Sequence, residues 1–186
     1  MRELKKIFSL LTFSLGILLV GGSIFAEVPQ ATQSYTDRTH WFQLTVPEGW
    51  QVSSSKGKGN DLSEVLTLRD GAASEVHLTL HIRPLKDLSE LVTREQLLEQ
   101  AKAILKAVTL QKSPGPVSEI TGWPMTGVRA EYSESSGEHT RLTILIDAPR
   151  RRAFIWKAAA PAAIFPRYDV TFDQIIAGLV PALPEN

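Results

Sequence analysis

Alternation of apolar and polar side chains between Val76 and Ile82 constrains the fold of this chain most strongly. Val76, Leu78, Leu80 and Ile82 alternate with His77, Thr79 and His81. A period of two places the apolar side chains on one face of a strand, and that face must be buried against another element. Pro84 cannot donate a hydrogen bond to a sheet, so we expect the strand to end there.

A second strand is predicted in the stretch FQLTVPEGW, residues 42–50. Its apolar side chains, Phe42, Leu44 and Val46, alternate with Gln43 and Thr45. Pro47 ends the strand, and Gly49 permits a turn. Trp50 resumes the chain beyond the turn, where its ring can close the end of a core. Pro47, Gly49 and Trp50 are therefore interpreted as a structural turn motif.

Two amphipathic helices are predicted. The first follows the capping box that begins at Thr93, and its apolar side chains recur at helical spacing in Leu97, Leu98, Ala101, Ile104, Leu105 and Val108. The second follows the segment AAPAAIFPRY, which we expect to be irregular, with Asp169 as its cap. Short strand segments with turn residues between them fill the rest of the chain. This order predicts an α+β fold, in which an antiparallel sheet has helices on both faces.

The first 26 residues follow the plan of a secretory signal. Arg2, Lys5 and Lys6 precede an uncharged apolar stretch and the small residues GGSIFA. Residues 7–26 are also long enough to cross a bilayer, so an uncleaved membrane anchor is the alternative. Either interpretation predicts export of residues 27–186, to the periplasm or another extracytoplasmic space. We expect residues 27–40 to be a flexible leader and residues 41–183 to be a single domain.

Composition excludes several functions for the exported part. Residues 1–26 hold three basic residues and one acidic residue, which leaves 17 basic and 19 acidic residues and a net charge of −2. This balance argues against a broad nucleic-acid interface. The chain has no cysteine, and therefore no disulfide, thiol nucleophile or thiolate-bound metal. His77 and His81 are about 13 Å apart on one strand, too far to share one ion. We expect no metal and no cofactor.

Four stretches resemble the PsbP-like family of domains. They are FQLTVPEGW, which follows a signal peptide, ITGWPMTGVRAEY, FIWKAAAP and YDVTFDQIIAGL, and the resemblance spans residues 41–180. The wider fold class includes DcrB-like envelope proteins and Ran-binding nucleotide-release factors. The resemblance implies an antiparallel sheet with helices on both sides. Members associated with photosystems act in the thylakoid lumen, a location that applies here only if the source is photosynthetic.

The resemblance also implies a role without catalysis. Such domains bind, assemble or stabilise other proteins, so we expect an envelope or membrane protein as the partner. Contact with a membrane is expected only through residues 1–26, if they are not cleaved. Two alternatives stay open: a carrier of a small apolar or lipid-like ligand, and an envelope enzyme whose site is assembled from scattered polar residues. No catalytic residue is assigned, because the chain contains no G-x-S-x-G sequence.

Candidate partner-binding residues are Arg150, Arg151, Arg152, Trp41 and Trp123. The three arginines are the densest charge in the chain and are predicted to lie at the tip of a hairpin, where they could meet an acidic partner, phosphate groups or anionic lipid. A solvated turn is the alternative. We expect triple replacement by Ser to leave folding intact. Trp41 and Trp123 are either exposed contacts for a partner or buried beneath a helix. Trp156 is expected in the core.

Overall fold

The computed structural model describes residues 32–38, 41–54, 63–86, 88, 93–109, 114–120 and 125–182. Its elements, in chain order, are β1 (Thr32–Asp37), β2 (Phe42–Pro47), β3 (Trp50–Ser54), β4 (Ser63–Asp70), β5 (His77–Pro84), α1 (Arg94–Val108), β6 (Ser118–Ile120), β7 (Thr126–Ser133), β8 (Glu138–Asp147), the 3-10 turn η1 (Ala148–Arg150), β9 (Arg152–Pro161), α2 (Phe165–Ala177) and β10 (Leu179–Pro181).

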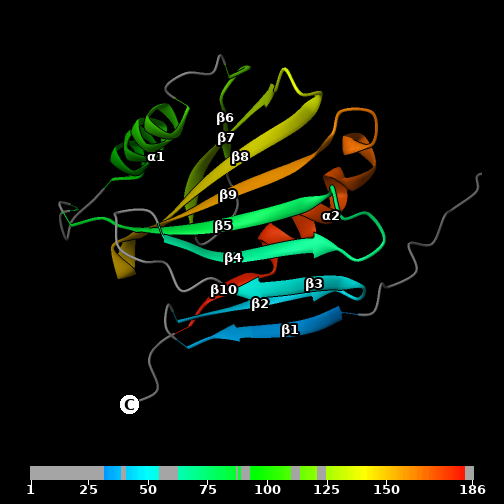
Figure 1. Cartoon of the computed structure of the whole chain (residues 1–186). Helices are drawn as coiled ribbons and strands as arrows, with labels where there is room; N and C mark the ends of the chain where they lie inside the picture. The colour runs from blue at the N-terminus through cyan, green and yellow to red at the C-terminus, as the bar shows by residue number, and fades with distance from the viewer. Residues whose placement is uncertain are drawn as a thin grey trace, which may run out of the picture.

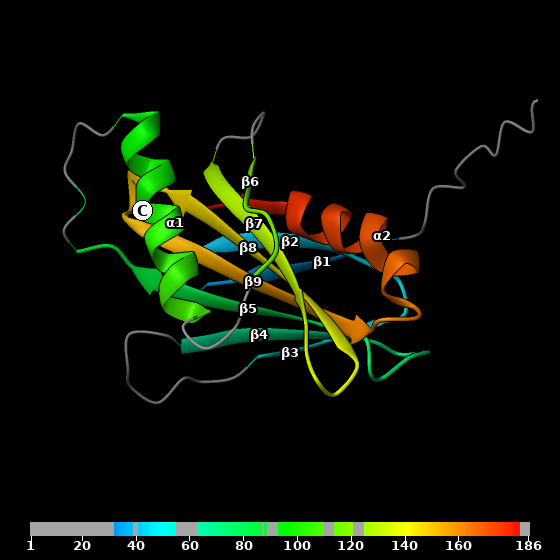
Figure 2. The same cartoon turned by 90° about the horizontal axis from the view of Figure 1, so that it is seen from above.

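The strands form two antiparallel sheets. The larger has the order β3-β4-β5-β9-β8-β7-β6, and the smaller has the order β1-β2-β10. Helices α1 and α2 lie on opposite sides of the larger sheet (Figure 2). The predicted α+β architecture is therefore confirmed, with one difference: β2 and β3 are consecutive but belong to different sheets.

The turn between β2 and β3 explains how the chain passes from one sheet to the other. Gly49 has φ +89°, a conformation that glycine adopts without a steric cost. Its carbonyl accepts a hydrogen bond from the amide of Gly71 at 3.0 Å, which fixes the turn against the end of β4. Trp50 is 6% exposed and packs against Phe172 of α2, with ring centroids 6.1 Å apart. The predicted turn motif thus closes one end of the core.

Helix α1 begins where its capping box predicts. The amide of Gln96 donates to the side chain of Thr93, and the amide of Thr93 donates to the side chain of Gln96. Leu98, Ala101, Ile104 and Leu105 are buried. They pack on β7 and β8, next to Val128, Ala130 and Ile144.

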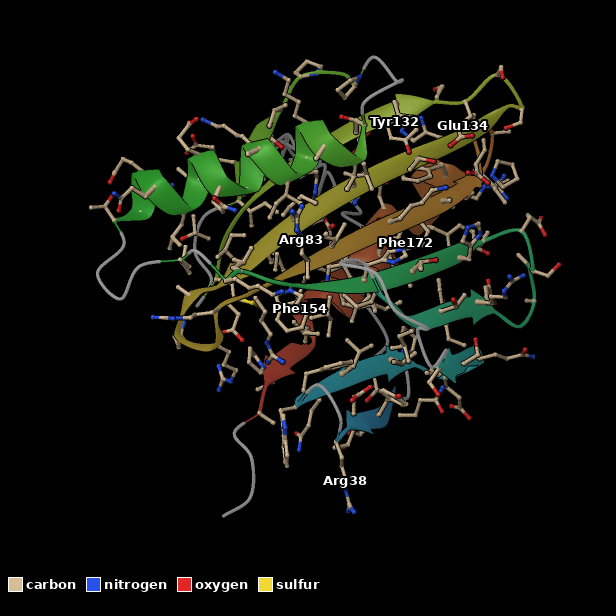
Figure 3. The ribbon with its side chains drawn as sticks, turned by 60° about the vertical axis from the view of Figure 1, so that its left-hand side comes forward. Arg38, Arg83, Tyr132, Glu134, Phe154 and Phe172 are labelled. Carbon is tan, nitrogen blue, oxygen red and sulfur yellow. The ribbon has the colours of Figure 1, made fainter. Side chains whose placement is uncertain are left out.

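Helix α2 covers the opposite face. Phe172, Ile175 and Ile176 are buried with Phe42, Phe154 and Trp156. Phe154 and Phe172 are both labelled in Figure 3, where α1 lies in front of the larger sheet and α2 behind it. Because β8 is covered on both sides, its residues from Thr140 to Asp147 are all buried. Trp156 is 0% exposed, as expected.

Two expectations from the sequence are wrong. Residues 32–37 of the supposed flexible leader form β1, which pairs with β2 from Thr32↔Pro47 to Asp37↔Phe42. Helix α2 begins at Phe165, within the segment expected to be irregular, so Asp169 lies inside the helix and does not cap it. The predicted signal segment, residues 1–26, lies outside the described residues. None of the described helices has the length and apolar character needed to span a bilayer.

Candidate functional site at the strand ends

Two of the four described candidate residues pair with a buried carboxylate where β8 ends. Asp147, the last residue of β8, is 2% exposed. The Arg152 Nε atom donates to its Oδ2 at 2.9 Å, and the Arg150 Nη1 atom donates to its Oδ1 at 3.2 Å. A buried carboxylate is stable only when it is paired and hydrogen-bonded, so both arginines hold this turn together. As predicted, η1 and Arg151 form the hairpin turn between β8 and β9.

The same turn holds Trp41, which lies far away in the sequence. The Arg152 Nη2 atom donates to the Trp41 carbonyl at 3.1 Å, and the Ala182 amide donates to that carbonyl at 2.9 Å. The Arg150 Nε atom donates to the Ala182 carbonyl at 3.1 Å. The start of β2, the β8–β9 turn and the residue after β10 are thus joined at one end of the molecule.

The backbone is unusual at two of these residues. Trp41 has φ 52° and Arg151 has φ 47°. Each lies in the left-handed region, which costs a non-glycine residue about 1–2 kcal/mol. Hydrogen bonds offset this cost: the Trp41 carbonyl accepts two, and the Arg151 carbonyl accepts one from the Leu85 amide at 2.7 Å. The sequence left two positions open for Trp41, an exposed contact or burial beneath a helix. Trp41 is half-buried, which is intermediate between the two.

The pKa of Arg152 is lowered, mainly because the guanidinium is buried. The hydrogen bond and the negative charge of Asp147 raise this pKa, and the positive charge of nearby Arg150 lowers it further. An arginine remains cationic at neutral pH after a shift of this kind, so the turn keeps its positive charge. The guanidinium of Arg152 also lies over the ring of Phe154, 4.7 Å from the centroid. Arg152 is therefore mainly a structural residue.

Two further cations lie at this end, and sequence reasoning missed both. Arg38 directly follows β1, and Lys86 follows Leu85, whose amide binds the Arg151 carbonyl. Both side chains are exposed, and Arg38 extends away from the end of β1 (Figure 3). We call Arg38, Trp41, Lys86, Arg150, Arg151 and Arg152 the strand-end surface. Only the strand order brings these isolated charges together, so no sequence signal could have found them.

The remaining predicted residues are not part of this surface. Pro47, Gly49 and Trp50 lie at the opposite end of β2 (Figure 1). Trp123 lies outside the described residues. The structure also changes the expectation for the triple Ser replacement. That replacement would remove both partners of buried Asp147, so we now expect it to destabilise the fold.

A second group of charges lies between α2 and the larger sheet. The side chain of Arg141 is 3% exposed and pairs with Glu131 and Asp173, each at 2.9 Å, and with Asp169. Arg129 pairs with Asp173 at 2.6 Å, and the Nε2 atom of His139 lies 3.2 Å from Glu131. The cluster contains two arginines, Arg129 and Arg141, and the carboxylates of Glu131, Asp169 and Asp173, and it joins α2 to β7 and β8. Its arrangement is that of a structural network.

Metal binding receives no support from the described part of the chain. Among those residues, no group of three or more His, Asp or Glu side chains is placed to hold a metal ion. His77 and His81 are both on β5, on one face of the sheet, with intermediate exposure.

Comparison with known proteins defines the class of fold. No protein-family model matches the sequence, and no curated protein matches it either. Among solved structures, the chain is similar to cyanobacterial PsbP (CyanoP) from Synechocystis, with a TM-score of 0.59 and 14% identity over 86% of this chain and 97% of that one. The chain therefore has the PsbP-like fold that its sequence predicted.

Two other structures extend this fold class. The Ran-binding protein Mog1p from Saccharomyces cerevisiae has a TM-score of 0.51 and 8% identity, over 82% of this chain and 96% of that one. LpqN from Mycobacterium tuberculosis, described as involved in cell envelope biogenesis, has a TM-score of 0.50 and 10% identity, over 83% of this chain and 86% of that one. At these identities the similarity establishes the fold alone.

Proposed function

We propose that this chain is an exported, non-catalytic binding or assembly factor of the bacterial cell envelope. The observation that carries the proposal is the strand-end surface. This surface brings Trp41 together with the three arginines, which lie more than 100 residues later in the sequence. A hydrogen bond from Arg152 to the Trp41 carbonyl joins the two segments. Trp and Arg are enriched among the residues that dominate binding energy at protein interfaces.

The fold and the N-terminal sequence support this proposal. Mog1p, which shares the fold, is described as a Ran-binding protein, and LpqN is described as involved in cell envelope biogenesis. The signal-like residues 1–26 favour export. The proposed partner is an envelope or membrane protein, and the proposed location is the periplasm or another extracytoplasmic space.

Packing favours this proposal over a ligand carrier. A carrier of a small apolar molecule would need space between a sheet and a helix. Between the larger sheet and α2, the rings of Phe42, Phe154, Trp156 and Phe172 are each 0% exposed and belong to one continuous core. Charged groups that an enzyme might use are engaged in ion pairs, as in the networks around Asp147 and Arg141.

Site-specific photocrosslinking in living cells tests the proposal. A benzophenone amino acid would replace Arg38 in the full-length exported chain, and a matched variant would carry it in place of Arg167. Arg167 is also exposed but lies in the first turn of α2, at the other end of the molecule. We expect one dominant protein adduct from position 38 and none from position 167.

Further positions make a negative result decisive. Glu48, Glu99 and Val170 are exposed on different elements and would carry the same amino acid in turn. The absence of a protein adduct at every position, with the protein folded and exported, would count against a binding factor and favour the ligand or enzyme alternatives.

A further inference from the structure

We infer that the strand-end surface binds an acidic segment of a protein, an inference that rests on the proposed function and specifies the chemistry of its partner. Its five cations are Arg38, Lys86, Arg150, Arg151 and Arg152. The chain as a whole has equal numbers of basic and acidic residues, so this excess of positive charge is local. Local charge of one sign attracts a partner of the opposite sign and excludes partners of like sign.

Among the described residues at this end, Asp37 and Asp147 offset only part of the charge of the five cations. Asp37 and Asp147 are 8% and 2% exposed, so neither residue contributes appreciably to the exposed surface. Asp147 is already paired with Arg150 and Arg152. Arg38 and Lys86 are exposed and have no ion pair with any described residue. No described carboxylate therefore competes with another chain for these two outer cations.

Trp41 adds a half-buried apolar side chain to the surface. Two hydrogen bonds to its carbonyl, from Arg152 and Ala182, hold its backbone in the left-handed conformation. A side chain whose backbone is already fixed loses less conformational freedom on binding. Arginine donates two parallel hydrogen bonds to a carboxylate, so the exposed Arg38 on the same surface as a tryptophan suits a peptide with both acidic and apolar residues.

If residues 1–26 remain in the membrane, the direction of β1 favours a protein over the bilayer as the partner. β1 begins at Thr32, at the opposite end of the molecule, and reaches the strand-end surface at Asp37 (Figure 1). A strand of this length spans about 20 Å. Only residues 27–31 separate β1 from the predicted signal segment. With the signal segment in the membrane, the strand-end surface would lie on the side of the domain that faces away from the bilayer.

Charge reversal tests the inference with a matched control. R38E/K86E reverses the two outer cations and leaves the pairing of Asp147 intact. R69E/R167E makes the same change in net charge at the other end, where the Tyr168 hydroxyl donates to Asp70 at 2.7 Å and so places the start of α2 beside the end of β4. The probes are a labelled peptide rich in Asp and Glu with one Phe, the same peptide with Asn and Gln, and vesicles of phosphatidylcholine and phosphatidylglycerol.

We expect the acidic peptide to bind, the amide peptide not to bind, and R38E/K86E to weaken binding about ten-fold while R69E/R167E retains it. Trp41→Ala should weaken binding about five-fold. Fluorescence anisotropy at about 0.02 M and about 0.15 M salt would measure these changes.

Three results would overturn the inference: no binding of the acidic peptide, equal weakening by both charge reversals, or binding of the vesicles through Arg38 and Lys86 without binding of the peptide. The proposed function fails separately, since it depends on crosslinking to a protein in the cell. A crosslinked partner that binds R38E/K86E and the unaltered chain equally tightly would leave the proposed function standing. The same result would exclude contact between an acidic segment of that partner and the strand-end surface.

Discussion

At the scale of single residues, the three consecutive arginines have different tasks. Arg152 is buried against Asp147 and the Trp41 carbonyl, Arg150 joins Asp147 to the residue after β10, and Arg151 is exposed. The sequence showed three equal charges. Their burial differs because β9 begins at Arg152, which therefore turns into the sandwich, whereas Arg151 occupies the left-handed position of the turn.

Removal of Arg152 should destabilise the fold. Arg152→Ala leaves a 2% exposed carboxylate with one partner, so we expect a loss of about 3 kcal/mol in the free energy of unfolding. Arg167→Ala, at an exposed position in the first turn of α2, is the control, with an expected change below about 0.5 kcal/mol. Urea unfolding of both variants measures the difference. Equal effects would mean that the Asp147 pairing contributes little.

Gly127 should not tolerate a side chain. A Cβ atom on this β7 residue would lie 2.1 Å from the Ile144 carbonyl oxygen and 2.8 Å from a methyl group of Leu145. Since the backbone of β8 cannot move away without breaking the ladder, Gly127→Ala should cost about 3 kcal/mol. At Gly115 the nearest atom would be 3.1 Å away, so Gly115→Ala should cost less. Thermal unfolding would rank the two, and the reverse order would contradict this account.

At the scale of elements, β1 shows how tertiary contacts order a polar segment. Residues 32–37 have no sustained apolar period, yet they form six pairs with β2. Tyr35 packs against Phe42 with ring centroids 6.3 Å apart, and the Gln33 side chain donates to the Trp50 carbonyl at 2.7 Å. These contacts also connect the smaller sheet to β3.

Truncation separates the strand from the predicted leader. A chain that begins at Arg38 lacks β1 and exposes the edge of β2, so we expect it to be less stable by about 2 kcal/mol and more prone to self-association. A chain that begins at Thr32 keeps β1 and is the control. Calorimetry and light scattering would compare them. Equal melting temperatures would mean that residues 32–37 act as the flexible leader after all.

At the scale of the whole molecule, the Arg141 network couples α2 to the larger sheet. Burial opposes the ionised form of Glu131 in this network. Hydrogen bonds from His139 and Arg141 outweigh that effect, so the pKa of Glu131 lies below its usual 4.5. A carboxylate whose pKa is lower in the folded state stabilises the fold above its unfolded pKa, and this contribution disappears as the pH falls through the folded pKa.

Glu131→Gln should therefore reduce the loss of stability in acid. We expect the unaltered chain to lose stability between about pH 5 and about pH 3, and the variant to show a smaller loss over that range. Glu48→Gln, at an exposed turn residue, is the control. Urea unfolding at several pH values gives the slopes. A variant with the unaltered slope would show that Glu131 does not contribute.

The sequence by itself determined the elements with strong local signals. The alternation in β2 and β5, the capping box of α1 and the core position of Trp156 were all predicted correctly, because period and cap depend on neighbouring residues. The fold class followed from the order of these elements, and similarity to CyanoP confirms it.

Tertiary structure alone decided the rest. The division into two sheets, the ordering of β1 and the start of α2 at Phe165 depend on contacts between segments far apart in the chain. The same holds for the strand-end surface, whose residues come from three different connections between elements: Arg38 and Trp41 from the one between β1 and β2, Lys86 from the segment after β5, and Arg150 from the turn between β8 and β9. Single charges have no period and no fixed spacing, so only the packing of the strands determines which of them meet.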